Sequence, residues 1–183
     1  MVQTKSLTFI LATFFLLSLS RNAAFGQITF EANAGIGATG VDIDAWTYNT
    51  ANDWGLLMGL ASAAVYPLKL GKISIGAEFY FHHFFWYNYI PYGYSYTSEV
   101  EINAFGPMAL VRYDITDNLF VDAGAGAHIF KEFTDFGVMV SVGYKIKLGE
   151  KLYIPIKIRT ERVFDEDAAL YPVGLNIGIG YTL

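Results

Sequence analysis

Histidines and acidic residues are the side chains of this chain that suit acid–base chemistry or metal binding; the 183 residues include 3 His, 17 Asp or Glu and no Cys. Thiol chemistry and disulfides are therefore excluded. His82 and His83 are adjacent, and His128 stands alone. A general base needs a nucleophile beside it, and no serine is placed near His83 on a neighbouring row. We predict no catalytic residue, no cofactor and no metal site, since aromatic packing explains the histidine pair equally well.

Further acidic residues lie in segments between the regular stretches. Asp42, Asp44 and Asp53 form one group, and Asp165-Glu-Asp167 forms another. Carboxylates of this kind could hold a divalent cation. Single acidic residues in exposed loops are more often simply solvated, and we favour that interpretation for both groups.

Outside these segments the sequence alternates with a period of two. From Val173 to Leu183 every odd position is large and apolar, and every even one is small or polar. This is the pattern of a strand with two unlike faces. The same pattern predicts eight strands, at about Ile28–Ala38, Leu56–Tyr66, Ile73–Trp86, Glu99–Tyr113, Leu119–Phe130, Phe136–Leu148, Lys151–Val163 and Val173–Leu183.

In most of these strands the charged residues share one face and the β-branched residues share the other. If the polar faces meet, their charges must pair, which predicts a structural network. Its predicted members are Glu31, Glu78, Glu101, Asp122, Lys145, Lys157, Arg159 and Glu161, and Arg112 is left open as a further member. We place Asn103, His82 and His128 on this polar side and His83 on the other. Around Phe105-Gly-Pro-Met108 the alternation of polar and apolar residues becomes irregular, and we predict a β-bulge there.

The beginning of the chain resembles an export signal. Lys5 precedes an apolar run from Leu7 to Leu19, and Ala24-Phe25-Gly26 has the small-x-small pattern of a cleavage site. We therefore predict that residues 1–26 are a cleaved signal peptide and that residues 27–183 form one domain. The net charge is −5, and no basic face is visible, so nucleic acid is excluded as a partner.

Composition and loop lengths favour a membrane barrel over a soluble sheet. Hydrophobic residues make up 54% of the chain and aromatic residues 17%, spread over short strands. The connections are expected to alternate between long and short, with Phe164–Pro172 among the long ones, as in outer-membrane barrels. A charged face can be the solvated face of a soluble sheet, but eight apolar faces would then need a dry core from this chain alone. The predicted fold is all-β, an eight-stranded antiparallel up-and-down transmembrane β-barrel.

Tyrosine and tryptophan favour both membrane–water interfaces. The aromatic residues near the strand ends therefore predict two girdles. The girdle at the short turns would contain Tyr66, Tyr113, Tyr144 and Tyr181, and the girdle at the long loops would contain Trp46, Trp54, Trp86, Tyr87, Phe136 and Tyr171.

Three stretches carry a family resemblance: Val65-Tyr-Pro-Leu68, Gly106-Pro-Met-Ala-Leu-Val-Arg-Tyr-Asp114 and the closing Gly-Ile-Gly-Tyr-Thr-Leu183. With them the chain resembles small bacterial outer-membrane β-barrels, the OmpA/OmpX-type and the PorT-like barrels of Bacteroidota. The resemblance implies the outer membrane of a Gram-negative bacterium. Members of such families are membrane-stabilising proteins, adhesins, secretion components or small enzymes, so fold does not settle role.

An eight-stranded barrel is filled by its own side chains. We therefore predict a non-enzymatic barrel with a plugged lumen, acting as a structural, surface-binding or complex-forming membrane component. Outer-membrane lipid and a protein partner are its expected partners, and the alanines near Ala61–Ala64 and Ala123–Ala127 offer a smooth wall. A lipid-modifying enzyme and a narrow small-solute transporter are the alternatives. The candidate surface-binding loop contains Trp86, Tyr87, Tyr89, Tyr92, Tyr94 and Tyr96.

Overall fold

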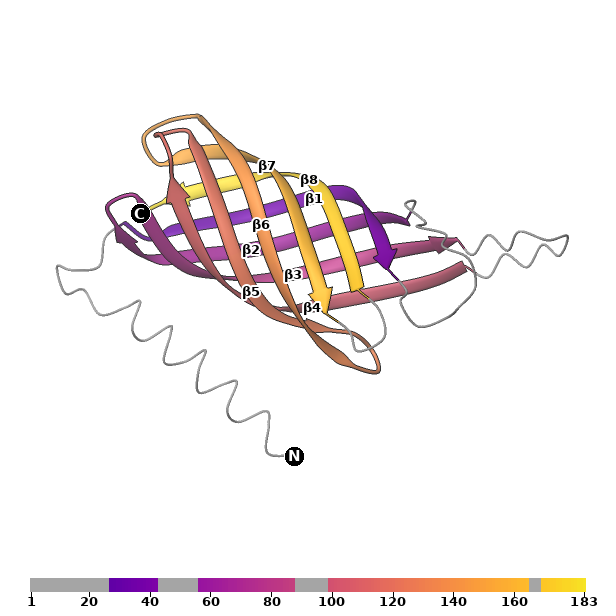
Figure 1. Cartoon of the computed structure of the whole chain (residues 1–183). Helices are drawn as coiled ribbons and strands as arrows, with labels where there is room; N and C mark the ends of the chain where they lie inside the picture. The colour runs from indigo at the N-terminus through magenta and orange to yellow at the C-terminus, as the bar shows by residue number, and fades with distance from the viewer. Residues whose placement is uncertain (1–26, 43–55, 88–98, 165–168) are drawn as a thin grey trace, which may run out of the picture.

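The computed structural model describes residues 27–42, 56–87, 99–164 and 169–183, and Figure 1 shows them as a closed barrel of tilted strands. Several predictions lie outside these residues: the signal peptide (1–26), Trp46, Trp54, the acidic groups at 44–53 and 165–167, and most of the tyrosine-rich loop. They stay predictions. No helix long and apolar enough to cross a membrane occurs within the four described ranges.

Eight antiparallel strands form the barrel, in chain order around the wall. Each strand pairs with its neighbours in the sequence, and β8 pairs with β1 along fourteen consecutive residues, from Thr29↔Thr182 to Asp42↔Ala169. The predicted fold class, an eight-stranded antiparallel barrel, is therefore confirmed. The strands are β1 (Thr29–Asp42), β2 (Leu56–Leu70), β3 (Ile73–Tyr87), β4 (Glu99–Asp114), β5 (Leu119–Ile129), β6 (Thr134–Lys147), β7 (Leu152–Phe164) and β8 (Ala169–Thr182).

Tight turns join β2 to β3, β4 to β5 and β6 to β7 at one end of the barrel. The first consists of Gly71 and Lys72, and Gly71 has a φ of 61°, a conformation that only glycine adopts without strain. In the second, the Thr116 hydroxyl accepts hydrogen bonds from the backbone N–H groups of Asn118 and Leu119. These three connections are short, as the sequence pattern predicted.

At the opposite end the last connection is shorter than predicted. The sequence indicated a long loop over Phe164–Pro172, but the β7–β8 ladder continues through Val163↔Leu170 and Phe164↔Ala169. Only residues 165–168 remain between the two strands. Hairpin pairing of the backbone thus extends beyond the stretch in which side chains alternate.

The predicted bulge at Phe105-Gly-Pro-Met108 is wrong. β4 keeps one register against both β3 and β5 through this stretch. The irregularity lies in β2, between Val65 and Leu68, where Pro67 has no N–H to give to the ladder. Because the register of β4 is unbroken, its even-numbered residues face the interior along the strand. Asn103, which was expected on the polar side, is therefore exposed.

Large inward side chains of β5 and β7 pack against glycines of the neighbouring strands. A Cβ on Gly180 would lie 2.2 Å from the Tyr153 ring, and a Cβ on Gly143 would lie 2.3 Å from the Phe120 ring. Large residues of β7 thus lie opposite small residues of β8, as in the pairs Tyr153↔Gly180 and Arg159↔Gly174. A narrow lumen is filled in this way without overpacking.

Candidate functional site: outer wall and filled interior

The outer wall of the barrel is apolar. Along β6 and β8, alternate residues such as Val142, Ile177 and Ile179 are 50%, 57% and 61% exposed. The residues between them point inward and are small or polar, such as Ser141 and Asn176, which are buried. Soluble monomers rarely expose a continuous apolar surface of this extent, so the wall is built to contact lipid or protein.

Aromatic residues mark the end of the wall that carries the tight turns. Tyr113, Tyr144 and Tyr181 are all exposed there, and the Tyr144 hydroxyl accepts a hydrogen bond from the Asn118 side chain at 3.1 Å. Tyr66 was predicted in the same girdle, and this is wrong. Its ring is buried inside the barrel, because β2 turns that position inward next to a cation.

At the opposite end, Phe136 is exposed and Tyr171 is half-buried. Trp86 and Tyr87 belong to β3 by their backbone, but their side chains lie outside the described part of the chain. The remaining residues of the candidate surface-binding loop, Tyr89, Tyr92, Tyr94 and Tyr96, also lie outside it.

Arg112 is the centre of a buried ion cluster that joins four strands. Its guanidinium Nε donates to Asp122 Oδ1 at 2.6 Å, and Nη1 donates to Glu31 Oε1 at 2.5 Å. Nη2 contacts the second oxygen of each carboxylate, at 3.0 Å for Glu31 and 2.9 Å for Asp122. Lys157 Nζ completes the cluster at 2.6 Å from Glu31 Oε2. We call these four residues the Arg112 cluster; it contains two cations and two carboxylates.

Aromatic side chains enclose the Arg112 cluster. The guanidinium lies 3.9 Å from the centre of the Phe120 ring and 4.4 Å from that of Tyr66, where each ring face attracts the cation. The Tyr66 hydroxyl accepts a hydrogen bond from Arg112 Nη2 at 3.0 Å, and the Tyr153 hydroxyl donates one to Glu31 Oε1 at 2.6 Å. Every charge of the cluster thus has a close partner, as a buried ion network requires.

A second buried group, the Arg159 cluster, consists of Glu78, Arg159 and Glu161. Arg159 Nη1 donates to Glu78 Oε2 at 2.6 Å, and Nε donates to Glu161 Oε1. Its remaining Nη2 lies 3.9 Å from the Met108 sulfur. One cation here serves two carboxylates, so the cluster carries an excess negative charge.

The predicted network is thus split among several places. Seven of its eight members have described side chains, and six of these lie in the two clusters. The seventh, Lys145, is at the mouth, where its Nζ lies 2.6 Å from Asp114 Oδ1. The side chain of Glu101 lies outside the described residues. Arg112 is the centre of the first cluster. Its membership was left open from the sequence, because the expected bulge obscured which way β4 faces.

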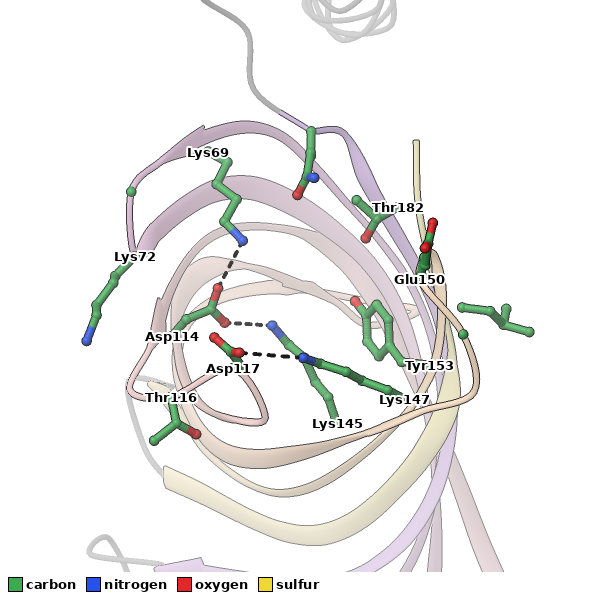
Figure 2. Close-up of a pocket in the computed structure, with 14 residues that line it drawn as sticks. Lys69, Lys72, Asp114, Thr116, Asp117, Lys145, Lys147, Glu150, Tyr153 and Thr182 are labelled. Atoms are coloured by element: carbon green, nitrogen blue, oxygen red, sulfur yellow. Dashed lines mark hydrogen bonds and ion pairs between the residues drawn. The ribbon is translucent and has the colours of Figure 1, made fainter.

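A pocket of about 420 Å³ opens at the end with the tight turns (Figure 2). Figure 2 shows the charged side chains that line it, with dashed lines from Lys69 and Lys145 to Asp114 and from Lys147 to Asp117. Tyr153 also lines the pocket, and the Lys145 ammonium lies 5.1 Å from the centre of the buried Phe120 ring. The pocket therefore borders the rings that enclose the Arg112 cluster.

His83 faces outward, as predicted, and its Nδ1 lies 2.6 Å from Asn103 Oδ1. Its partners in the neighbouring strands are Gly59 and Asn103, neither of which is a nucleophile. His82 and His128 face inward and are fully buried. The described cross-strand neighbours of His83 thus offer none of the nucleophiles that a lipid-modifying enzyme would need.

No protein-family model matches the chain, and no curated protein matches it. Solved structures do. Ail, the attachment invasion locus protein of Yersinia pestis, is 10% identical with a TM-score of 0.53, over 86% of this chain and 100% of that chain. OprG from Pseudomonas aeruginosa is 10% identical with a TM-score of 0.51, over 87% and 97%.

Neisserial surface protein A is also similar, at 11% identity and a TM-score of 0.50, over 83% of this chain and 96% of that chain. At such identities the likeness shows the fold alone. This chain accordingly has the fold of small eight-stranded outer-membrane β-barrels, and the OmpA/OmpX-type or PorT-like membership suggested by its sequence motifs is not established.

Proposed function

We propose that this chain is an integral outer-membrane barrel without enzymatic activity, located in a Gram-negative bacterium after export through a cleaved signal peptide. The observation that carries the proposal is that the distribution of polar and apolar side chains is the reverse of that in a soluble protein. Aliphatic side chains such as Ile177 are exposed, and ion pairs such as Arg112–Glu31 are buried. A closed barrel has no free strand edge, which is the condition for a sheet to cross lipid. OprG, which has a similar fold, is an outer-membrane protein, and this supports the location.

Fractionation of the producing cells tests the location. We expect the chain in the outer-membrane fraction, resistant to extraction with alkaline carbonate. An unheated sample should run faster in SDS gels than a boiled one, because a folded barrel stays compact in the detergent. Release into the soluble fraction would contradict the proposal.

The filled lumen favours a structural or surface-binding role over transport. Two ion clusters and the rings of Phe120 and Tyr153 occupy the interior, so no continuous water path is expected. In planar bilayers the wild-type chain should therefore be insulating. Arg159→Ala should remain so, because the Arg112 cluster still fills the lumen. A steady conductance that rises in Arg159→Ala would favour the transporter instead.

For the expected protein partner, we infer that the wall of β1 and β2 is the contact surface. Ala32 lies opposite Ala63, and Ala34 lies opposite Ala61, and all four are exposed. Small side chains let two walls approach closely within a membrane. This patch contrasts with the bulky valines and isoleucines of β6 and β8.

Bulky substitutions on this patch test the partner. Ala34→Trp should reduce the native mass of the particle extracted in mild detergent, because the ring would hold the partner's wall away. Val140→Trp, on the outer face of β6, is the matched control and should leave the mass unchanged. If the wild-type particle has the mass of one barrel, the proposal of a stable protein partner is contradicted. The alanine patch would then contact lipid only.

A further inference from the structure

Two histidines and one carboxylate that are far apart in the sequence meet inside the barrel. His82 of β3, His128 of β5 and Glu161 of β7 each offer one ligand atom, and these atoms all lie within 4.8 Å of one another. The His82 and His128 side chains are 0% exposed and that of Glu161 is 1% exposed. We propose that these three residues bind one divalent transition-metal ion, for which zinc is the best match to the donor set.

The polar atoms of this triad lack the partners that buried groups normally have. All four ring nitrogens of the two histidines, and Glu161 Oε2, have no hydrogen-bond partner among the described residues. Native proteins leave very few buried polar atoms unpaired, and each such atom calls for an explanation. Here one ring nitrogen of each histidine and one Glu161 oxygen lie within 4.8 Å of one another. Tyr80, packed against both rings, instead donates its hydroxyl hydrogen to Ala127 O at 2.8 Å.

Two distances in the triad, each to a different oxygen of Glu161, are close to those between neighbouring ligands of a tetrahedral metal ion. His82 Nε2 lies 3.4 Å from Glu161 Oε1, and His128 Nε2 lies 3.5 Å from Glu161 Oε2. Zinc binds nitrogen and oxygen ligands at about 2.0–2.2 Å, which places neighbouring ligand atoms of a tetrahedron about 3.3–3.5 Å apart. Two imidazoles and a carboxylate are a common zinc donor set, with a fourth position left for water or another ligand.

The charge of the surroundings also favours a cation. The Arg112 cluster is balanced, but the Arg159 cluster has two carboxylates for one guanidinium. Among the described buried side chains, Arg159 is the one permanent cation within ion-pair distance of Glu161. His82 and His128 are also within that distance, but they are cations only when protonated. A bound divalent ion would balance this excess and would also give one nitrogen of each histidine a partner.

The walls of the site are shaped around His128. Gly137 of β6 lies against the ring, and a Cβ there would be 2.3 Å from His128 Nε2. Two aromatic rings pack against His82: the Tyr80 ring lies 4.8 Å from it, and the Phe84 ring meets it edge-on at 5.6 Å. Because apolar clusters flank the triad on both sides, the ion would have to enter before the barrel closes.

The test is metal binding during refolding. The full chain is unfolded, stripped with chelator, refolded into detergent with or without equimolar zinc chloride, and passed over a desalting column before elemental analysis. We expect one zinc per folded wild-type barrel. We also expect cobalt to give the intense visible absorption of a tetrahedral site.

Matched variants locate the site. His83→Gln changes the adjacent, outward histidine and should retain the metal, whereas His128→Gln should lose it together with the cobalt spectrum. Gly137→Ala keeps all three donors but displaces the His128 ring, so it should also lose the metal. The SDS gel shift checks that each variant is folded; where one is not, His82→Gln takes its place.

Two results would overturn the proposal. One is a folded wild-type barrel that retains no zinc or cobalt, in which case a histidine carries the balancing proton instead. The other is retention in His128→Gln with loss in His83→Gln, which would place the metal on the outer surface.

Discussion

Replacing Arg112 by methionine should lower the free energy of unfolding of the barrel by about 3–5 kcal/mol, the cost of breaking a buried ion network by removing one partner. Methionine has a similar length, so the loss is chiefly of charge and hydrogen bonds. Glu31 and Asp122 would each lose two bonds and stay buried, with Lys157 as the remaining cation of the Arg112 cluster. Urea unfolding of the barrel folded into lipid vesicles, followed by tryptophan fluorescence, measures the change.

Lys147→Met is the control for this experiment. Lys147 is 53% exposed and its partner Asp117 is 94% exposed, so the pair is screened by water and the change should stay below about 1 kcal/mol. The double variant Arg112→Met with Glu31→Gln should recover part of the loss, since one uncompensated charge disappears. Equal effects of Arg112→Met and Lys147→Met would show that the interior network does not stabilise the fold.

Ile177→Arg should destabilise the barrel by about 2–4 kcal/mol if the outer wall faces lipid, because a cation near the bilayer midplane is costly. Ile177 lies near the middle of β8, with its side chain on the outer face. On a solvated surface the same change would stay within about 0.5 kcal/mol. The same unfolding assay in vesicles gives the value.

A matched substitution at the end of the wall makes this result specific. Leu183 follows β8 and is also exposed, and Leu183→Arg should cost only about 0–1 kcal/mol, because a cation can reach the interface from there. The expected result is a difference that depends on depth. If both variants cost the same, the apolar wall does not lie in a bilayer.

Period-two alternation was enough to predict the eight strands, because one face of each strand is mostly apolar. Composition and loop lengths then indicated a closed barrel. Facing was also predicted well where alternation is strict, as at Arg159 and Glu161. It was wrong where proline and glycine interrupt the pattern. Arg112 and Asn103 were obscured by a bulge predicted in β4, whereas the actual irregularity lies at Pro67 in β2.

The contacts between strands could not be predicted in the same way. Whether a residue stands at an odd or an even position of its strand predicts which face of the wall it lies on. Its position along the barrel axis depends instead on how the strands are staggered around the barrel. Lys145 and Arg159 share the polar side, yet the first lies at the mouth with Asp114 and the second lies within the barrel with Glu78. For the same reason the meeting of His82, His128 and Glu161 has no signal in the sequence: they come from three strands.

The pairing of β1 with β8 also has a kinetic consequence. Its hydrogen-bonded hydroxyls, Thr29 and Thr182, are 153 positions apart in the chain. Contacts of such long range are slow to form, because the entropy of loop closure is lost before the contacts contribute stability. Until that seam forms, the sheet has two unpaired edges that could join those of another molecule. Crowded, incompletely folded chains are therefore expected to aggregate, and the search for the closing seam should limit the folding rate.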